Sequence, residues 1–479
     1  MRLGSAAMLA HPRGRAEGFW NPAKRLLLEP GLVERAEGAA LKIGAVQKHS
    51  GNPLFGEDKP WEVRFDNLYA NVMFDEQERI FKCWYNPFLH YQKHEMVPRD
   101  RRATTDYASV PQREPEMGVC YATSHDGLAW EKPELGLVEY NGSMRNNILL
   151  RNRPAPSLWR PHGSGVWKDL RDADPARRYK IFFSRPGNSM CVAFSADGVH
   201  WGEPIACPEI ASRGDCHNNT FWAPSLERYV GITRNFDNRE RTRLVARTES
   251  PDFLHWTRAE EVLRHAPSEP LRQTYTMIAF PYADAYLGLL MLLNRGDRID
   301  RSDPHNDTVD CELAWSRDTV RWERILPGSP LIPRGALGAV DSGCIYAAAY
   351  PVAHNGELRL YYGGNNGKHT DWRDGFLNLA RLRPDGFAGM EAPAAGWLFT
   401  RPMAWEGAAL RISADAPGGS VVAKILEGER VAGESLPATG TLHDAAVAWR
   451  KPVRKAAAGR PVRLRFELHA ATLYSFSLG

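Results

Sequence analysis

The sequence predicts an all-β protein: a five-bladed β-propeller over residues 60–392, followed by a β-sandwich domain over residues 393–479. Three observations support this fold class. A short phrase recurs along the chain, each copy of it follows a β-hairpin, and the pattern of strands changes near Ala394. Repeats of this length are typical of propellers, and almost no segment has the apolar period of a helix.

The repeated phrase is Ser, any residue, Asp, and then Trp four residues after the Asp. Its four copies lie about 55 to 70 residues apart. They begin at Ser124, Ser195, Ser250 and Ser316, and a degenerate fifth copy is Arg383-Pro384-Asp385-Gly386-Phe387. Ser and Asp side chains can bond nearby backbone N–H groups, Gly supplies a positive φ, and Trp packs between sheets. We therefore interpret the phrase as a structural turn that leaves a strand, with no chemistry of its own.

Each repeating unit begins with a hairpin of two apolar strands, and a third strand then leads into the phrase. Three or four short strands in each of five units are typical of a five-bladed propeller. The five predicted hairpins pair residues 67–74 with 80–85, 165–169 with 179–183, 219–222 with 229–233, 276–280 with 286–291, and 344–349 with 358–362.

The segments outside these hairpins fall into three groups. Residues 1–59 show no clear period, and we expect them to form an N-terminal segment packed on the propeller. Residues 88–115 form a long polar loop in the first unit, and loops of that length are often functional. Short alternating strands after Ala394 predict the sandwich. Because no cluster of His, Asp or Glu faces one way there, we expect it to stabilise the propeller or an oligomer.

The composition limits the classes of function. The chain has 479 residues, of which 43% are hydrophobic and 25% charged, as is ordinary for a soluble globular protein. A net charge of +4 without a long basic run argues against a nucleic-acid partner. The seven cysteines include no C-x-x-C pair, which argues against a disulfide framework and a structural zinc site. No stretch approaches 18 apolar residues, and His11 and Pro12 break the apolar run at the start, so we expect a cytoplasmic protein without a membrane partner.

The predicted propeller points to one end of its central channel as the functional region. The first strand of each blade lines that channel, so residues at the start of these strands converge at one mouth. Counting back from the first turn of each unit places Asp66 and Asp215 at matched positions, and Asp341 stands just ahead of the fifth hairpin. The same count brings Arg160, His162, Thr274 and Tyr275 to this mouth.

Two explanations fit three carboxylates in one channel. Arg160, Arg234 and the channel ends could neutralise them, or they could carry chemistry, because a buried charge without a use or a partner is costly. Carboxylates that face each other suit glycoside cleavage, in which one gives a proton to the leaving oxygen and the other attacks the sugar or activates water. Crowding of like charges raises one pKa and separates the two roles.

Further side chains near the expected mouth could hold a sugar. Trp159 and Tyr275 could stack on sugar faces, although each alone is more often a core residue. His217 shares the face of Asp215 if the strand is extended, and with His162 it forms a pair. Such histidines could bond a hydroxyl, act as an acid or bind a metal, although a plain hydrogen-bonding role is more common.

At this point the sequence resembles a known group. The phrases Phe65-Asp66-Asn67 and Gly214-Asp215-Cys216-His217-Asn218, the turn at 316–318 and Leu473-Tyr474-Ser475-Phe476 look like bacterial proteins similar to glycoside hydrolase family 32. The resemblance covers about residues 60–479. It implies a five-bladed propeller with three acidic residues in its channel, as in families 32, 43 and 68.

The resemblance also implies roles for particular residues. In family 32 a blade-one Asp is the nucleophile, and Asp66 matches that position. A blade-two Asp in an Arg-Asp-Pro phrase stabilises the transition state there, but this chain has Trp159-Arg160-Pro161-His162 instead. The blade-three Glu that serves as the acid is also missing, and Asp215 is the nearest carboxylate. The family's Trp-Met-Asn-Asp-Pro-Asn-Gly phrase is absent as well.

We therefore predict a glycosidase with Asp66 as nucleophile or base, Asp215 as acid and Asp341 as a supporting carboxylate. The predicted substrate is a carbohydrate, held by Arg160, His162, His217, Trp159, Arg234 and Tyr275. No redox cofactor is implied, and a Ca²⁺ ion would find oxygen ligands in the channel. The alternatives are a non-catalytic carbohydrate-binding propeller, a sialidase-like hydrolase, for which no arginine triad is apparent, and a phosphorylase on the same fold.

Overall fold

The computed structural model describes residues 19–152, 159–185, 189–269, 272–295, 302–405, 409–453 and 461–478. Within these residues the protein is nearly all β, which confirms the all-β prediction. The two α-helices of this part of the chain are short, Gln92–Met96 (α1) and Arg99–Arg102 (α2). Three single 3₁₀ turns accompany them: Tyr107–Ser109 (η1), Pro175–Arg177 (η2) and Pro208–Ile210 (η3).

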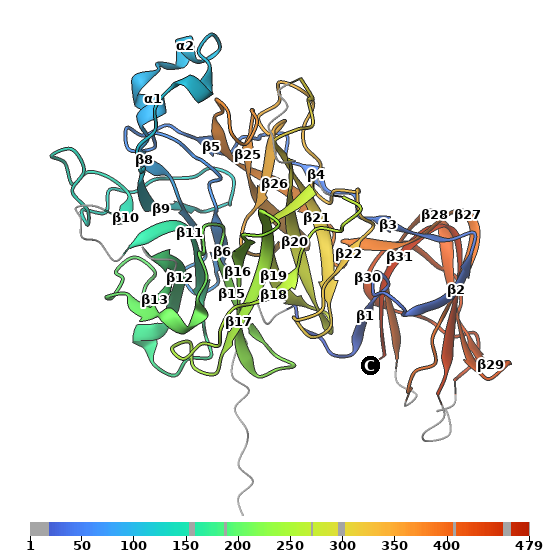
Figure 1. Ribbon diagram of the computed structural model, residues 1–479. Helices are drawn as coiled ribbons and strands as arrows, with labels where there is room; N and C mark the ends of the chain where they lie inside the picture. The colour runs from blue at the N-terminus through green and yellow to red at the C-terminus, as the bar shows by residue number, and fades with distance from the viewer. Residues whose placement is uncertain are drawn as a thin grey trace, which may run out of the picture.

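Three antiparallel sheets follow one another from the first predicted hairpin onwards (Figure 1). The first contains Asn71–Asp75 (β6), Ile80–Tyr85 (β7), Phe88–His90 (β8), Glu116–Ser124 (β9) and Ile148–Arg151 (β10). The second contains Arg160–Lys168 (β11), Tyr179–Arg185 (β12), Ser189–Ser195 (β13) and Ile205–Cys207 (β14). The third contains Asn219–Ala223 (β15), Arg228–Asp237 (β16), Thr242–Ser250 (β17) and Glu260–Leu263 (β18).

A ten-stranded sheet comes next, and it consists of two strand groups joined by a single parallel pair, Val309 with Cys344. The first group is Arg272–Tyr282 (β19), Ala285–Asn294 (β20), Thr308–Ser316 (β21) and Glu323–Ile325 (β22). The second is Cys344–Ala347 (β23), Val352–His354 (β24), Glu357–Asn365 (β25) and Gly375–Leu382 (β26), extended by Gln47–Lys48 (β4) and Phe55–Gly56 (β5).

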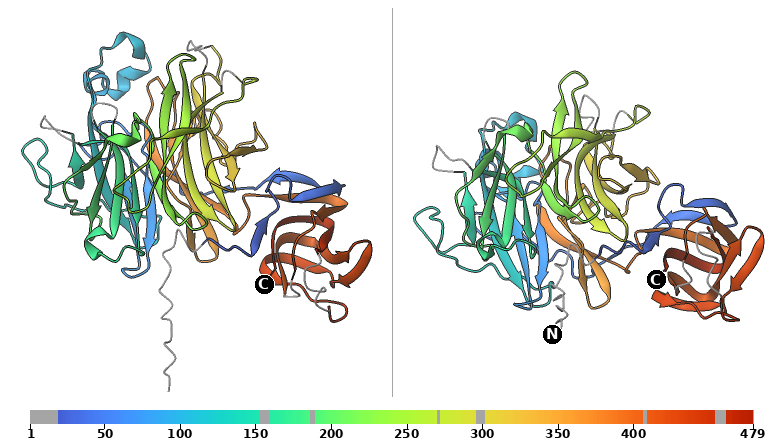
Figure 2. Two further views of the ribbon diagram at one scale, coloured as in Figure 1. Left: turned by 60° about the horizontal axis from the view of Figure 1, so that its bottom comes forward. Right: turned by 90° about the horizontal axis from the view of Figure 1, so that it is seen from below.

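Hydrogen bonds connect each of these five strand groups to the next, and the last to the first. The Asn71 side chain accepts from Val166 N at 2.9 Å, and Asn219 does the same for Ala279 N at 2.8 Å. The remaining links are between backbone groups: Asn218 N to Gly163 O, Val309 N to Gly343 O, and Ala349 N to Ala70 O. The strand groups therefore form a closed circuit (Figure 2).

The approach of the second sheet to the third depends on glycine. Gly163 has a φ of +69°, and a Cβ there would lie 1.6 Å from Cys216 O. A Cβ on Gly165 would lie 2.0 Å from Asn218 O. No larger residue could occupy either position without moving backbone, so these glycines fix how closely the two innermost strands pack.

The repeated Ser–Asp phrase forms the same turn in all four copies. The Ser hydroxyl donates to the Asp and accepts from the N–H three residues after the Ser. The Asp Oδ1 accepts from the N–H groups two and three residues after it. The residue after the Asp has a positive φ each time, including Phe253 at 67° and Thr319 at 65°. These bonds give the Ser and Asp the structural roles that their chemistry predicts.

Replacing Asp197 with Ala is expected to lower the free energy of unfolding by about 1–2 kcal/mol, because two backbone N–H groups lose their acceptor. Burial raises the pKa of Asp197, but hydrogen bonds from His200 and Val199 lower it more, so the net pKa is depressed. The stabilisation is therefore present above about pH 4 and disappears as the pH falls. Urea unfolding at pH 7 and pH 3 would measure it, with Glu203→Ala as a charge-matched control. Equal stabilities of Asp197→Ala and wild type at pH 7 would contradict this prediction.

The C-terminal residues join an eight-stranded sheet that lies to one side of the other sheets (Figures 1 and 2). Its C-terminal members are Ala388–Thr400 (β27), Leu410–Glu427 (β28), Arg430–Glu434 (β29), Ala438–Ala446 (β30) and Arg463–Leu478 (β31). Strand pairing connects all eight strands, whereas the sequence suggested a sandwich of short strands. Register shifts at Ser413/Ala414 and Asp415/Ser420 mark bulges that let β28 continue over 18 residues.

The N-terminal segment is divided between two sheets, which differs from the expectation that all of it packs on residues 60–392. Lys24–Leu26 (β1), Val33–Glu37 (β2) and Ala40–Ile43 (β3) pair with β31 and β27 of the C-terminal sheet. Only β4 and β5 pair with β26. Strand β27 also begins at Ala388, before the expected boundary. The sequence did not reveal β1–β3 because they are short and charged residues interrupt their apolar ones.

Ending the protein at Ala394 is expected to abolish soluble expression or to lower the melting temperature strongly. The truncation removes β28 to β31 and the second half of β27, which leaves β1 and β2 without their partners. The core that is lost contains buried side chains such as Ile412, Phe466 and Phe476. Soluble yield and thermal unfolding of the truncated protein would test this. A soluble protein with an unchanged melting temperature would contradict it.

Two further features concern the cysteines and the length of the helices. All seven cysteines are buried and have free thiols. Among the described residues, no helix is long and apolar enough to cross a membrane.

Candidate functional site

Asp66 lies in an irregular segment just before β6 rather than in the strand itself. The strand begins at Asn71, and Leu68 and Tyr69 have positive φ values of 61° and 43°. The expected regular strand from residue 67 is therefore wrong over its first four residues. A positive φ at two bulky residues turns the chain sharply, and this turn aims Asp66 and Asn67 at side chains from distant elements.

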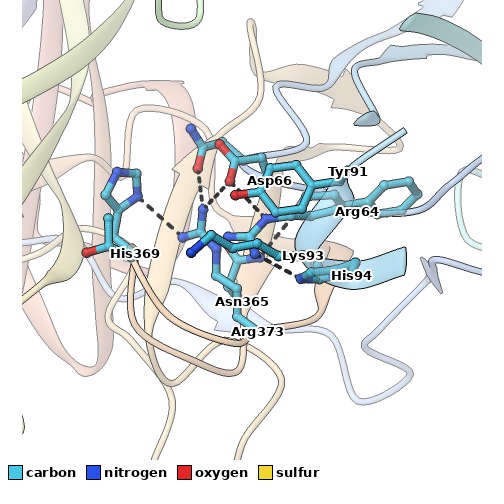
Figure 3. Close-up of polar contacts among 12 residues, drawn as sticks. Arg64, Asp66, Tyr91, Lys93, His94, Asn365, His369 and Arg373 are labelled. Atoms are coloured by element: carbon cyan, nitrogen blue, oxygen red, sulfur yellow. Dashed lines mark hydrogen bonds and ion pairs between the residues drawn. The ribbon is translucent and has the colours of Figure 1, made fainter. Parts of the chain in front are cut away.

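Two arginine side chains hold Asp66, as Figure 3 shows. Arg64 Nε donates to Asp66 Oδ1 at 3.1 Å, and Arg373 Nη2 donates to the same oxygen at 2.8 Å. Arg373 comes from the loop between β25 and β26 and also donates to Asn67 Oδ1 at 3.1 Å. The Asp66 side chain is 18% exposed, and among the described residues its Oδ2 has no hydrogen-bond donor. Oδ2 is therefore available to a ligand.

Asp66 is ionised over the whole physiological range of pH. Burial raises the pKa of Asp66, but the charges of Arg373 and Arg64 lower it more, with smaller contributions from His162 and His369. The net pKa is well below that of an ordinary aspartate. Asp66 can therefore act as a nucleophile or a base, but it does not carry a proton to give to a leaving group.

Each of these arginines is flanked by a neutral histidine. His94 Nε2 lies 2.9 Å from Arg64 Nη1, and His369 Nδ1 lies 3.4 Å from Arg373 Nη1. Burial and then the neighbouring arginine lower the pKa of both histidines, that of His94 to about 2. His94 belongs to α1 in the long loop 88–115, and Tyr91 from the same loop packs against Arg64. That loop thus supports the arginine that holds Asp66.

Asp215 lies four residues before β15 and is the second carboxylate of the site. Arg234 Nη2 donates to Asp215 Oδ2 at 2.7 Å, and the Asp215 side chain is 48% exposed. Burial raises the pKa of Asp215, but Arg234, His162 and Arg160 lower it more, so the net pKa is below its usual range. The charge of Asp66 acts on the pKa of Asp215 in the opposite direction and raises it.

Aromatic and imidazole rings lie beneath the two carboxylates. Asn67 Nδ2 donates to Tyr69 Oη at 2.6 Å and to Tyr275 Oη at 3.0 Å. The Tyr69 ring lies 5.1 Å from the His162 ring and 5.2 Å from the His217 ring. His217 is fully buried, with a pKa lowered to about 3 by burial, and its Nε2 lies 3.3 Å from Asn71 Oδ1. His162 contacts Tyr69, and Tyr275 bonds Asn67, next to Asp66, whereas His217 is buried against Tyr69 and Asn71.

The structure separates two predicted residues from this site. Asp341 bonds Lys48 Nζ at 2.5 Å and accepts from Tyr362 Oη at 2.8 Å, and neither partner touches Asp66 or Asp215. Its charge is neutralised locally by an N-terminal lysine, so a role as supporting carboxylate is wrong. The Trp159 ring is partly buried and stacks on Phe183 at 4.6 Å, beside a hydrophobic core, so one of its faces is covered by protein.

Sequence reasoning missed most of the positive charge in the site. The two carboxylates and the basic side chains around them influence one another's pKa values. We call this group the Asp66–Asp215 cluster. Its basic members are Arg64, Arg160, Arg234, Arg243, Arg373, His162 and His369. Arg64 could have been found, since it alternates with Asp66 in Arg64-Phe65-Asp66. Arg243, His369 and Arg373 carry no local signal that connects them with Asp66.

The cluster does not fit a calcium ion. Five arginine side chains surround its two carboxylates, and this excess of positive charge disfavours a divalent cation. In the part of the chain that the structure describes, no three His, Cys, Asp or Glu side chains gather to hold a metal ion.

A cavity of about 230 Å³ lies away from the cluster, at the other end of β6 and β11. It is lined by apolar side chains such as Phe19, Phe74, Trp167 and Tyr350. Its basic residue, Lys168, is already paired with Asp75 at 2.6 Å. We therefore place the candidate site at the Asp66–Asp215 cluster rather than at this cavity.

Comparisons with known proteins do not assign the chain to a family. No family model matches it, and no curated protein does. Similar solved structures include an N-acetylgalactosamine deacetylase from F. plautii, with 14% identity over 72% of this chain and 96% of that chain and a TM-score of 0.43. A glycosyl hydrolase from Bacteroides ovatus gives 14% identity, 72% and 95% coverage, and a TM-score of 0.46.

A glycoside hydrolase family 43 arabinoxylan arabinofuranohydrolase from Bacillus subtilis gives 12% identity over 90% of this chain and 98% of that chain, with a TM-score of 0.42. Because all three TM-scores are below 0.5, the argument for function rests on the residues of this chain.

Proposed function

We propose that the protein is a glycoside hydrolase that uses Asp66 and Asp215 at the mouth of a five-bladed β-propeller. In this proposal the five strand groups are the blades, and the eight-stranded sheet folds over its own core as a β-sandwich. The closed circuit of hydrogen bonds between the strand groups supports the propeller. The alternating burial along β28 and β31 supports the sandwich.

One observation carries the proposal. Asp66 is fixed by two arginines through Oδ1, while Oδ2 is without a protein donor among the described residues and the side chain remains partly exposed. A carboxylate held in this way has one oxygen ready to attack an anomeric carbon or to activate a water molecule. Its rigid support keeps that oxygen in position, and small displacements of a reacting group are costly.

The geometry changes the role that we give Asp215. Its ion pair with Arg234 keeps the carboxyl ionised, so the predicted role as general acid does not fit. Two ionised carboxylates would instead stabilise the positive charge that develops on the sugar ring in the transition state. The proton for the leaving oxygen would then come from outside this pair. We therefore expect the fastest turnover with leaving groups that need no proton, such as 4-nitrophenolate.

A panel of 4-nitrophenyl glycosides tests the proposed function. We expect the wild-type protein to release 4-nitrophenol from at least one of them and Asp66→Asn to release far less. Failure of every 4-nitrophenyl and natural glycoside to react would reject the proposal.

One observation favours a second candidate, a non-catalytic carbohydrate-binding protein. Both carboxylates are tied to arginines, and the pKa of each is lowered, so neither carboxyl group holds a proton for a leaving group. Such a protein would bind a saccharide without turning it over. Isothermal titration with the same saccharides, carried out beside the activity assay, separates binding alone from catalysis.

A further inference from the structure

The Asp66–Asp215 cluster carries more positive than negative charge. It brings together five guanidinium groups but only two carboxylates. Its two histidines do not alter this balance, since burial lowers the pKa of both His162 and His369 and leaves them neutral. Part of the excess at Arg160 is offset by Glu114, whose carboxylate lies 3.7 Å away. The remaining cations have no matching anion within the cluster.

The unmatched charge lies at Arg243, whereas its neighbour Arg234 is paired with Asp215 through one nitrogen, Nη2. They lie on the paired strands β16 and β17, where Arg243 is opposite Phe236 and Arg234 is two residues before Phe236. The two arginines are therefore diagonal neighbours on one face of the sheet. Both guanidinium groups lie over the Tyr275 ring, at 5.1 Å and 5.6 Å from its centre. Tyr275 in turn accepts a hydrogen bond from Asn67, next to Asp66.

Both arginines have N–H groups that could donate to a ligand. Arg234 is 8% exposed, and its buried Nη1 has no hydrogen-bond partner in the described structure. Arg243 bonds the neutral Gln273 side chain at 2.8 Å and, among the described residues, no carboxylate. Burial and then the charge of Arg234 lower the pKa of Arg243, as expected for two unscreened cations side by side. A buried guanidinium nitrogen without an acceptor is costly unless a ligand supplies one.

We propose that Arg234 and Arg243 bind an oxyanion, so that the saccharide taken by this protein carries an acidic group or reacts together with a free inorganic anion. A carboxylate, sulfate ester or phosphate offers the planar or tetrahedral oxygens that guanidinium groups bind in pairs. The Tyr275 ring keeps both guanidinium groups in place. The part of this inference that concerns a saccharide rests on the proposed function, whereas the anion site does not depend on it.

Isothermal titration of the full-length protein tests the inference. The probes are D-glucuronate and D-galacturonate, the neutral sugars D-glucose and D-galactose, and inorganic phosphate and sulfate. We expect an acidic probe to bind more tightly than its neutral counterpart and binding to weaken as salt is added. Arg243→Gln should weaken acidic binding about tenfold to a hundredfold, the usual effect of losing a charge-assisted hydrogen bond. Arg243→Lys, which keeps the charge, should lose less.

Arg145→Gln is the matched control, because Arg145 is exposed and pairs with Glu134 on the surface. It should leave acidic binding unchanged, and equal melting temperatures of the three variants would exclude misfolding as a cause. Tight binding of a uronate assigns the anion to the saccharide, whereas binding of phosphate or sulfate alone assigns it to a free anion. No measurable binding of any acidic probe, or an Arg243→Gln protein that binds acidic probes like wild type, would overturn the inference.

The outcomes for this inference and for the proposed function can be told apart. Turnover of a neutral glycoside, with no Arg243-dependent binding of any acidic probe, would leave the glycosidase in place and reject the anion site. Arg243-dependent binding of an acidic probe, without turnover of any glycoside, would confirm the anion site and reject the hydrolase.

Discussion

Asp66→Asn is expected to lower turnover by about 10²–10⁴-fold or more, the range for a positioned acid–base group. The amide keeps the shape of the side chain but removes the charge that Oδ2 presents to a substrate. Saccharide affinity should change little, since the neighbouring donors are retained. Rates with the best 4-nitrophenyl glycoside and affinities from titration would measure the two effects separately.

The structure adds a second expected effect of this substitution. Arg373 is buried, and Asp66 neutralises it, so Asp66→Asn leaves a cation without its anion. Breaking a buried ion pair from one side typically costs about 3–5 kcal/mol, so the melting temperature should also fall. The double variant Asp66→Asn/Arg373→Gln removes both charges. It should recover part of the lost stability but none of the lost turnover.

Asp75→Asn is the matched control for Asp66→Asn. Asp75 is a buried carboxylate at the far end of β6, paired with Lys168 at 2.6 Å and bonded by Tyr179 at 2.9 Å. The control should lose stability and keep its turnover per folded molecule. If Asp66→Asn instead retained near-native turnover, Asp66 would be a structural partner of its arginines. The hypothesis that Asp66 is catalytic would then be rejected.

Asp385→Ala is expected to lower the free energy of unfolding by about 3–5 kcal/mol, because Asp385 is a buried anion that several elements share. It is 2% exposed and accepts from Lys24 Nζ at 2.9 Å and from Tyr282 Oη at 2.9 Å. The hydroxyls of Ser413 and Ser475 also donate to it, at 2.6 Å and 2.7 Å. These partners belong to β1, β19, β28 and β31, so one carboxylate connects the C-terminal sheet to the fourth strand group.

The stability lost with Asp385 should depend on pH. Burial raises the pKa of Asp385, but Lys24 and the two serine hydroxyls lower it more, so its net pKa is depressed. A depressed pKa gives stability that is present above about pH 4 and is lost as the pH falls. Wild type and Asp385→Ala should therefore differ most near neutral pH. Urea unfolding between pH 3 and pH 7 would show this.

Asp444→Ala is the control for Asp385→Ala. Its carboxylate also lies near Lys24, at 3.6 Å, but it is 40% exposed, and exposed ion pairs contribute about 0–1 kcal/mol. A loss at Asp385 no larger than the loss at Asp444 would show that the shared carboxylate does not connect the two parts of the protein.

The sequence predicted those features that are encoded locally. The turn at Ser195 and Asp197 follows from hydrogen bonds between residues at most three apart, and so the phrase could be interpreted from its own residues. The same phrase at 383–387 lacks its Ser, and the side chain that remains, Asp385, makes long-range contacts instead. Its role was missed because its partners, such as Lys24 and Tyr282, are far from it in the sequence.

The site could be predicted only in part, for a related reason. Counting along the strands placed Asp66, Asp215, His162 and Tyr275 near one mouth, because strand periodicity fixes which residues begin each hairpin. It could not tell that Arg373 would pair with Asp66, since 306 residues separate Arg373 even from the adjacent Asn67. Asp341 was misplaced because its local pattern resembles that of Asp66, while its partner Lys48 comes from an N-terminal strand with no recognisable period.

The pairing of the N-terminal strands has a consequence for synthesis of the protein. Strands β4 and β5 pair with β26, and β1 and β2 pair with β31 and β27, so these early residues have no partners until the last part of the chain leaves the ribosome. The nascent protein must therefore carry unpaired strands through most of translation, although unpaired strand edges promote aggregation. Strand Val33–Glu37 carries three charged side chains, Glu34, Arg35 and Glu37. Such side chains suit a strand that stays exposed to water until its partner strands have been synthesised.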